Sequence, residues 1–154
     1  MDAVGFAPDE IRIDEPTRSA RLKWVVVVDE ALPAGRQVNA AVCVGAATSA
    51  RVTGLLGPDA VDADGNEHPG LPWAGCSVLS ATSDALSLLR VKAAELDDVF
   101  VVDMPAAAQS TRVYSEYLEE MAKVAVADTA PLAVGLIGPR KSIDKLVKRM
   151  SLLA

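Results

Sequence analysis

The chain has 154 residues, of which 51% are hydrophobic, so we expect a folded protein with a sizeable core. Its net charge of −6 argues against general nucleic-acid binding, because neutralising phosphates requires a basic surface. No apolar run approaches the roughly 20 residues that span a bilayer, so we expect no membrane partner and a cytoplasmic location. Two cysteines and one histidine are too few for a standard structural zinc site, and we expect neither metal nor cofactor.

The first 20 residues differ in character from the rest of the chain. They include two prolines and five acidic side chains, which predicts an irregular arm with a short extended piece at Glu10–Ile13. Residues 21–154 are then expected to form a single α/β domain. Its first strand is Trp24–Val28, an apolar and mostly β-branched run that ends at Asp29 and should be buried on both faces.

The segment after this strand consists almost wholly of small residues. Val38–Ala47 is too long for one strand and has no turn signal, so it is predicted to be a helix. Its small side chains should let its backbone approach the neighbouring element closely. Cys43, within this segment, and Cys76 have apolar neighbours and are expected to be buried free thiols in a reducing compartment.

The remainder alternates between turn signals, strands and amphipathic helices. The first expected elements are an edge segment at Thr53–Leu56 and a turn-rich loop at Gly57–Pro72, with a hairpin near Asp64–Asn66. Strands are then expected at Trp73–Leu79, Val99–Val102 and Leu132–Ile137. Helices are expected from the start signal Ser80–Asp84 to Glu95, at Gln109–Val124, and from Gly138–Pro139 along an apolar stripe to Leu153. Apolar strands alternating with amphipathic helices predict a three-layer α/β/α sandwich.

Polar side chains follow three of the predicted strands. In open α/β sheets ligands bind at the carboxyl ends of parallel strands, so these side chains are the candidates for a site. They are Asp29, Arg36 and Asn39 after the first strand, Asp103 and Gln109 after the third, and Arg140 after the fourth.

Several polar residues also have a structural interpretation. Asp29 and Asp103 either accept turn amides at the ends of their strands or act in catalysis. Asn39 lies in a run of small apolar residues, where its amide must find partners, either in a neighbouring loop or in a ligand. His68, in the turn-rich loop, is interpreted as a solvated side chain rather than a base. The basic last helix is either a phosphate-facing patch or a solvated face, and we favour the latter.

Two longer stretches resemble known families. Leu132–Pro139, followed by Ser142–Leu146, resembles the final strand and helix of type II peptidyl-tRNA hydrolases, and Lys23–Ala47 resembles their opening strand, glycine-containing loop and helix. From Leu22 onward the chain is more similar still to an uncharacterised bacterial family, domain of unknown function 2000, which shares that fold. The motifs of this second resemblance are Leu32–Gly35 with Val38–Ala40, Gly57–Gly65, and Gly138–Arg140 with Asp144–Lys145.

The resemblance implies a four-stranded mixed sheet with helices on both faces, often dimeric in the hydrolases, and a catalytic role for Asp103. The hydrolases have a lysine-rich loop after the first strand and a helix with Gln and His, whereas this chain has Arg36 in the loop and Ala41–Val44 in the helix. Their Gly-Arg-Thr-Gln-like run is replaced here by Met104–Ala108, with Gln109–Arg112 a displaced equivalent.

Three functions follow from these observations. The first is a relative without hydrolase activity that binds a small molecule or a protein partner in the equivalent cleft. Its ligand contacts would be Asp29, Arg36, Asn39, Gln109 and Arg140. The second is a hydrolase of an aminoacyl or acyl ester, in which Asp103 orients water or substrate. The third is a homodimeric interaction subunit without a ligand.

Overall fold

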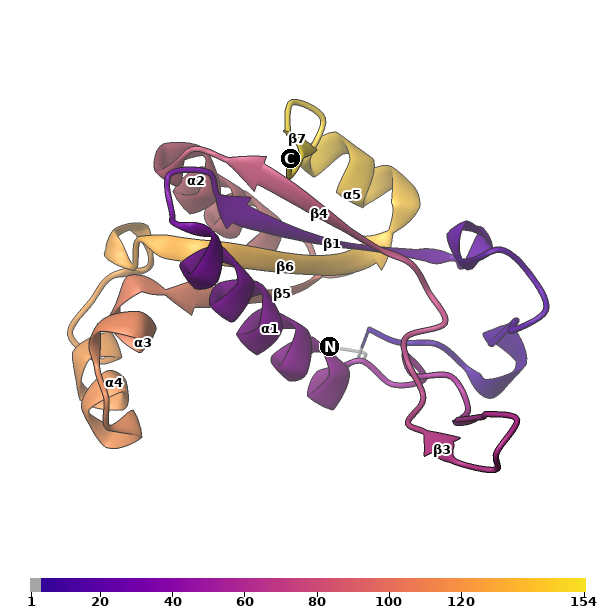
Figure 1. The fold of residues 1–154 in the computed structure, drawn as a ribbon. Coiled ribbons are helices and arrows are strands. Elements are labelled where there is room, and N and C mark those ends of the chain that lie inside the picture. The colour runs from indigo at the N-terminus through magenta and orange to yellow at the C-terminus, as the bar shows by residue number, and fades with distance from the viewer. Residues whose placement is uncertain (1–3) are drawn as a thin grey trace.

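The computed structural model describes residues 4–154. Five strands form one mixed sheet in the order β5–β6–β1–β4–β7, with helices on both faces (Figure 1). The strands are β1 (Leu22–Asp29), β4 (Cys76–Ala81), β5 (Phe100–Pro105), β6 (Pro131–Pro139) and β7 (Ser151–Leu152). The alternating pattern of the sequence therefore predicted the α/β class and its layers correctly.

β1 lies at the centre of the sheet. It pairs with β4 in parallel and with β6 in antiparallel orientation, so that Val26 lies opposite both Val78 and Gly135. Its side chains alternate between two cores: Val26 and Val28 belong to the core under α1, whereas Val25 and Val27 belong to the core under α2 and α5. Burial on both faces explains the unbroken apolar run.

α1 (Ala34–Arg51) covers one face of the sheet. Its buried residues are Ala40, Val44 and Thr48, which are spaced one turn apart. A Cβ atom on Gly135 of β6 would lie 2.4 Å from Cγ1 of Val44, so only glycine permits the observed approach of helix and strand. The predicted close packing of this small-residue helix is thereby confirmed.

The opposite face is covered by α2 (Ser83–Ala94) and α5 (Arg140–Leu146). Oγ1 of Thr82 accepts a hydrogen bond of 3.3 Å from the backbone N–H of Ala85, so the predicted helix start is capped as expected. The buried residues of α2 are Leu86, Leu89 and Ala93, at the helical spacing that the sequence indicated.

The sheet contains one strand more than the four predicted. The last helix ends at Leu146 rather than extending to Leu153, and the chain turns back so that Leu152 of β7 pairs with Leu79 of β4. The backbone N–H of Leu153 donates to the carbonyl of Val78 at 3.0 Å. These terminal apolar residues pair with the edge strand β4. The pairing satisfies backbone hydrogen-bonding groups of β4 that would stay unpaired if the terminal residues were helical.

The single helix predicted over Gln109–Val124 is instead two short helices, α3 (Ala106–Ser110) and α4 (Tyr114–Met121). The hydroxyls of Ser110 and Thr111 both donate to the carbonyl of Ala107, at 3.2 and 2.8 Å. Such side-chain bonds compete with helix continuation, and the backbone is extended at Thr111. Both helices lie beyond the end of the sheet, at the lower left of Figure 1.

The N-terminal arm contains two short 3₁₀ turns, Pro8–Glu10 and Thr17–Ser19, and packs through Phe6, whose ring lies 4.7 Å from that of Trp73. The extended piece predicted at Glu10–Ile13 is wrong, because Glu10 ends the first turn; the arm bridges Thr53 through Gly5 instead. The predicted hairpin is confirmed as β2 (Ala60–Val61) and β3 (Glu67–His68).

Candidate functional site

The strand directions divide the six predicted site residues between two edges of the sheet. β1, β4 and β5 share one direction and β6 runs against them. The ends that follow Asp29 and Asp103 therefore lie at one edge, whereas Arg140 follows β6 at the opposite edge. The expectation that these strand ends would form one site fails for Arg140, because the reversal of β6 cannot be read from its apolar sequence.

Three of the predicted residues form a clasp between α1 and α3, which consists of Arg36, Asn39 and Gln109. The amide oxygen of Gln109 accepts from Nε of Arg36 at 2.7 Å. Its amide nitrogen donates to the carbonyl of Arg36 at 3.1 Å and to Oδ1 of Asn39 at 3.2 Å. Asn39 is exposed rather than enclosed by apolar residues, and its amide oxygen accepts a bond from α3. The clasp fixes the end of α3 against the first turns of α1.

The two aspartates have different partners. Oδ1 of Asp29 accepts from the backbone N–H of Ala31 at 2.9 Å, the turn-stopping role that the sequence allowed. Asp103 forms an ion pair of 2.8 Å with Nε of Arg90 on α2, and its side chain is 14% exposed. The guanidinium of Arg90 therefore holds the Asp103 carboxylate in place from within the fold.

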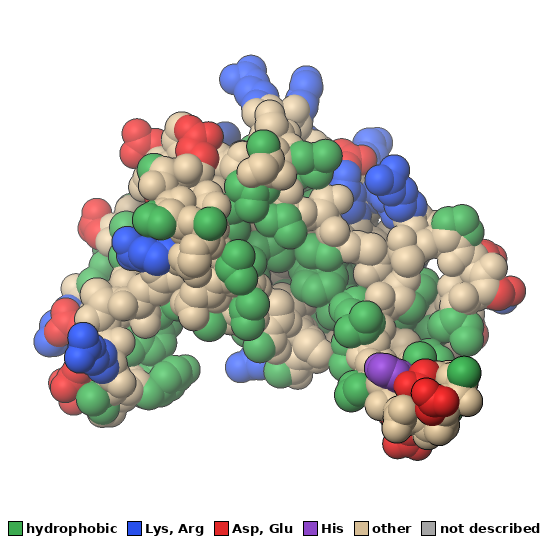
Figure 2. Space-filling model, viewed as in Figure 1, with side chains coloured by type: hydrophobic (Ala, Val, Ile, Leu, Met, Phe, Trp, Pro, Cys, Tyr) green, Lys and Arg blue, Asp and Glu red, His purple; other side chains and the backbone are tan. Residues whose placement is uncertain are grey.

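A cleft of about 580 Å³ lies between α1, the edge strand β5 and the α3–α4 pair, and we call it the α1–α4 cleft. It is lined by Cys43, Ala47, Val102, Asp103, Met104, Pro105, Ala108, Thr111, Arg112, Val113, Tyr114 and Tyr117. The clasp lies at one end, since Gln109 follows Ala108 and Asn39 lies one turn before Cys43. Figure 2 shows hydrophobic side chains over α1 and α4, where Val42 and Leu118 are exposed.

The polar groups of the cleft are few. Desolvation, with the nearby Tyr114 and Asp103, raises the pKa of Tyr117, so its hydroxyl stays neutral at physiological pH. The Thr111 hydroxyl is already bonded to Ala107. Arg112 forms no ion pair within residues 4–154. Cys43 is exposed at the wall, which corrects the prediction that it is buried; Cys76 is exposed as well.

The described residues offer no pairing of a nucleophile with a base in this cleft. His68 lies in the β2–β3 hairpin, where its Nε2 is 3.3 Å from Oδ2 of Asp62. Within residues 4–154 no group of three His, Cys, Asp or Glu side chains is placed to hold a metal ion. No helix in the same range is long and apolar enough to cross a membrane.

Sequence reasoning missed most of the cleft lining. Apart from Thr111 and Arg112, the missed residues are apolar or aromatic. They come from α1, β5 and the α3–α4 segment, and only the tertiary structure brings them together. The signal for the apolar residues is the series Val113, Tyr117 and Met121, whose spacing is typical of the apolar face of a helix. In the structure Val113 is 51% exposed and Tyr117 lines the cleft.

The fold and the cleft define an α/β protein with a five-stranded mixed sheet and an apolar cleft beside its edge strand. A family model described as a protein of unknown function, DUF2000, matches residues 22–154, so the chain belongs to this family. A similar solved structure is that of a protein of unknown function, Atu0240, from Agrobacterium tumefaciens strain C58, with 18% sequence identity and a TM-score of 0.81 over 87% of this chain and 98% of that chain. At this identity the likeness shows the fold alone. No curated protein matches the chain.

Proposed function

We propose that this protein binds a small apolar molecule with one anionic group in the α1–α4 cleft, on a scaffold resembling that of type II peptidyl-tRNA hydrolases but without their reaction. The observation that supports this most directly is the apolar lining of a cleft that no side chain of the described chain fills. Its volume of about 580 Å³ lies within the usual range of small-molecule sites, which also combine an apolar wall with few polar groups.

The polar groups suggest how the ligand would be oriented. Tyr117 supplies a neutral hydroxyl within the cleft, and Arg112 supplies an exposed guanidinium that forms no ion pair within residues 4–154. The apolar part of the ligand would contact Met104 and Val113, while its anionic group would face Arg112. An aromatic sulfonate or carboxylate has this division into an apolar body and a charged end.

Ester hydrolysis is the weaker alternative because Asp103 has no second acid or base beside it in the described lining of the cleft. Its Oδ1 pairs with Arg90, and among residues 4–154 the lining includes no His, Glu or second Asp that would share the proton transfers of such a reaction. The Asp103–Arg90 pair instead joins β5 to α2, so we assign Asp103 the role of a positioning residue that fixes the floor of the cleft.

A fluorescence titration with anilinonaphthalene sulfonate tests the proposal, because this dye has an aromatic body and one sulfonate. Ala47→Phe places a ring in the cleft, and Ala46→Phe places the same ring on the neighbouring exposed position of α1. We expect the first variant to weaken dye binding about tenfold or more, and the second to change it by less than about twofold.

Arg112→Gln should weaken the dye less than Ala47→Phe does, since it removes the charge and leaves the apolar wall. Equal dye binding by wild type and Ala47→Phe would contradict the cleft as the site. A second copy of the chain is the competing occupant, so light scattering belongs in the same experiment. A dimer whose formation excludes the dye would contradict the small-molecule proposal.

A further inference from the structure

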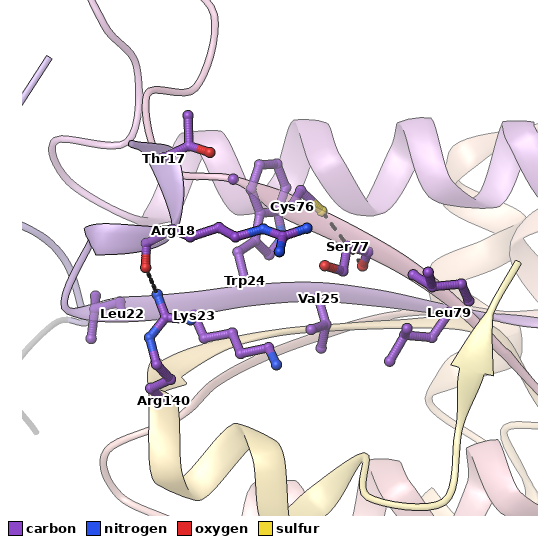
Figure 3. Close-up of a pocket in the computed structure, with 12 residues that line it drawn as sticks. Thr17, Arg18, Leu22, Lys23, Trp24, Val25, Cys76, Ser77, Leu79 and Arg140 are labelled. Carbon is purple, nitrogen blue, oxygen red and sulfur yellow. Dashed lines mark hydrogen bonds between the residues drawn. The ribbon is translucent and has the colours of Figure 1, made fainter. Parts of the chain in front are cut away.

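A second cavity, of about 550 Å³, lies beside the first residues of β1 and β4 (Figure 3). The α1–α4 cleft is elsewhere, beside the last residues of β5. The lining of the second cavity includes Thr17, Arg18, Lys23, Trp24, Ser77 and Arg140. Arg140 was predicted as a ligand contact in another setting, and it is the member of the basic last helix that faces this cavity. The proposed function makes no use of this second cavity.

The N-terminal arm forms one wall of the cavity. The carbonyl of Thr17 accepts a bond of 3.3 Å from the backbone N–H of Gly75, which lies just before β4. The guanidinium of Arg140 donates to the carbonyl of Arg18, and to that of Ala20 at 3.0 Å. These bonds hold the turn Thr17–Ser19 over the open edge of β4. They also fix the backbone from which the Arg18 side chain extends.

The charge of the cavity is opposite to that of the whole protein. Three cationic side chains line it, those of Arg18, Lys23 and Arg140, and no acidic residue does so among the residues that the structure describes. Lys23 pairs with Asp144 outside the lining, so three positive charges against one negative charge leave an excess of two. In a chain with a net charge of −6, this local excess of positive charge attracts anions to the cavity.

Neither Arg140 nor Arg18 pairs with a carboxylate of residues 4–154. The Arg140 guanidinium is bonded to two backbone carbonyls, whereas no group of residues 4–154 accepts a hydrogen bond from the guanidinium of Arg18. Figure 3 shows its side chain extending over the cavity toward Cys76 and Ser77, with the Lys23 ammonium on the other side of β1 from the indole of Trp24. A guanidinium held in this way offers several donors in one plane, an arrangement that suits phosphate and carboxylate oxygens.

One side chain of the lining has a hydrogen-bond donor without a partner among residues 4–154. The indole Nε1 of Trp24 is buried and makes no hydrogen bond in the described part of the chain. Native proteins rarely leave such a group unsatisfied.

β7 pairs with β4 only at Leu79 and Ser80, so no described strand covers the outer edge of β4 at Cys76. Although Cys76 as a residue is exposed, its thiol is desolvated, which raises the pKa of the thiol to about 11, so it remains a neutral group rather than a nucleophile.

We propose that this cavity binds a small phosphate monoester and that the N-terminal arm completes the site. The excess of two positive charges matches the charge of a phosphate monoester near neutral pH, about −1.5 to −2. The cavity is larger than a phosphate ion alone requires, so the ester part has room beside β4. Thr17 and Arg18 precede residues 22–154, which match the family, whereas the other lining residues lie within that range. The arm would therefore add ligand contacts to a cavity that is otherwise lined by the family domain.

Isothermal titration of the full chain with glycerol phosphate, and separately with inorganic phosphate, at low ionic strength tests this site. We expect saturable binding that Arg18→Gln weakens about tenfold or more. Arg51→Gln, an exposed position at the end of α1 with the same charge change, should weaken it by less than about twofold. Ala47→Phe should leave it unchanged, which separates this site from the α1–α4 cleft.

The two indole N–H signals in a proton–nitrogen spectrum give an internal control. Trp24 lines the cavity, whereas Nε1 of Trp73 already donates to the carbonyl of Gly54 at 2.7 Å. Glycerol phosphate should move the Trp24 signal saturably and leave that of Trp73 in place. Equal weakening by Arg18→Gln and Arg51→Gln, absence of saturable binding by both phosphates, or movement of the Trp73 signal alone would overturn the proposal.

Discussion

Val44 and Cys43 are neighbours in α1, yet one lies in a packed interface and the other lines an open cleft. On the sheet side, Val44 is 1% exposed and lies so close to β6 that Gly135 has no room for a Cβ atom. On the adjacent side, Cys43 and Ala47 face a cavity of about 580 Å³. Small side chains on a helix therefore give close packing only where a neighbouring element packs directly against them.

The neighbour on the cleft side, α3–α4, is kept at a distance by the way it is attached. α4 has no buried residue, and α3 is joined to α1 through the exposed side chains of the clasp. Few buried apolar contacts make such a segment the low-stability part of a fold. We therefore expect α1 to have one side that determines stability and one side that determines binding.

The largest expected effect is on the packed side. Gly135→Ala places a methyl group within 2.4 Å of Val44 Cγ1 and 2.9 Å of Val102 Cγ1, and we expect a loss of about 2 kcal/mol of unfolding free energy in urea titrations. Gly45→Ala is the matched control, because nothing lies within 4 Å of that position in α1. It should stabilise the protein by about 0.5–1 kcal/mol. Equal effects of the two substitutions would remove the asymmetry.

The next effect concerns the floor of the cleft. Arg90→Gln leaves the mostly buried Asp103 carboxylate without its cation, and we expect a loss of about 1–2 kcal/mol. The double variant with Asp103→Asn should recover part of this loss, which a double-mutant cycle measures. Asp103→Asn alone should keep dye binding within about twofold of wild type. Abolished binding with unchanged stability would instead give Asp103 a direct ligand role.

A smaller effect is expected from the clasp. Gln109→Ala removes the bonds to Arg36 and Asn39 but exposes no core, so the unfolding free energy should fall by less than about 1 kcal/mol. Amide hydrogen exchange in α3 and α4 should nevertheless accelerate. Gln37→Ala, which loses a bond to the carbonyl of Asp29, is the control that should leave exchange in α4 unchanged.

The smallest effect is on the arm and depends on pH. Hydrogen bonds from Arg21 and from the backbone N–H of Ala7 lower the pKa of Glu10 from 4.5 to about 2. Stabilisation from a lowered carboxyl pKa is complete above the unfolded value and is lost as the pH falls through the folded value. Signals of Phe6 should therefore begin to broaden only as the pH falls from about 4.5 toward 2. In Glu10→Gln this pH dependence should be absent.

The sequence predicted those parts of the fold that local patterns determine. The valines of β1 indicated a strand buried on both faces, and Thr82 with Leu86 and Leu89 indicated a capped amphipathic helix. The sequence did not predict the parts of the fold that contacts between distant residues determine. Leu153 has the spacing of a helical stripe but covers the edge of β4, and the reversed direction of β6 separates Arg140 from Asp103.

The candidate site could be predicted only in part for the same reason. Arg36, Asn39 and Gln109 do come together, but they form hydrogen bonds with one another instead of lining an open cavity. The cleft beside them is formed by Cys43, Met104 and Tyr117, whose apolar character indicates a core when the tertiary structure is unknown. The arm residue Arg18 gave no signal, because its setting depends on bonds from Arg140 across the fold.

The most direct test is a proton–nitrogen NMR titration of the wild-type chain with anilinonaphthalene sulfonate. The amide signals of Cys43, Ala47, Val113 and Tyr117 should shift together along one saturation curve, while those of Ser77 stay in place. Binding of the dye in the α1–α4 cleft predicts this result. Shifts centred on the exposed hairpin residue Val61, or shifts that never saturate, would contradict it.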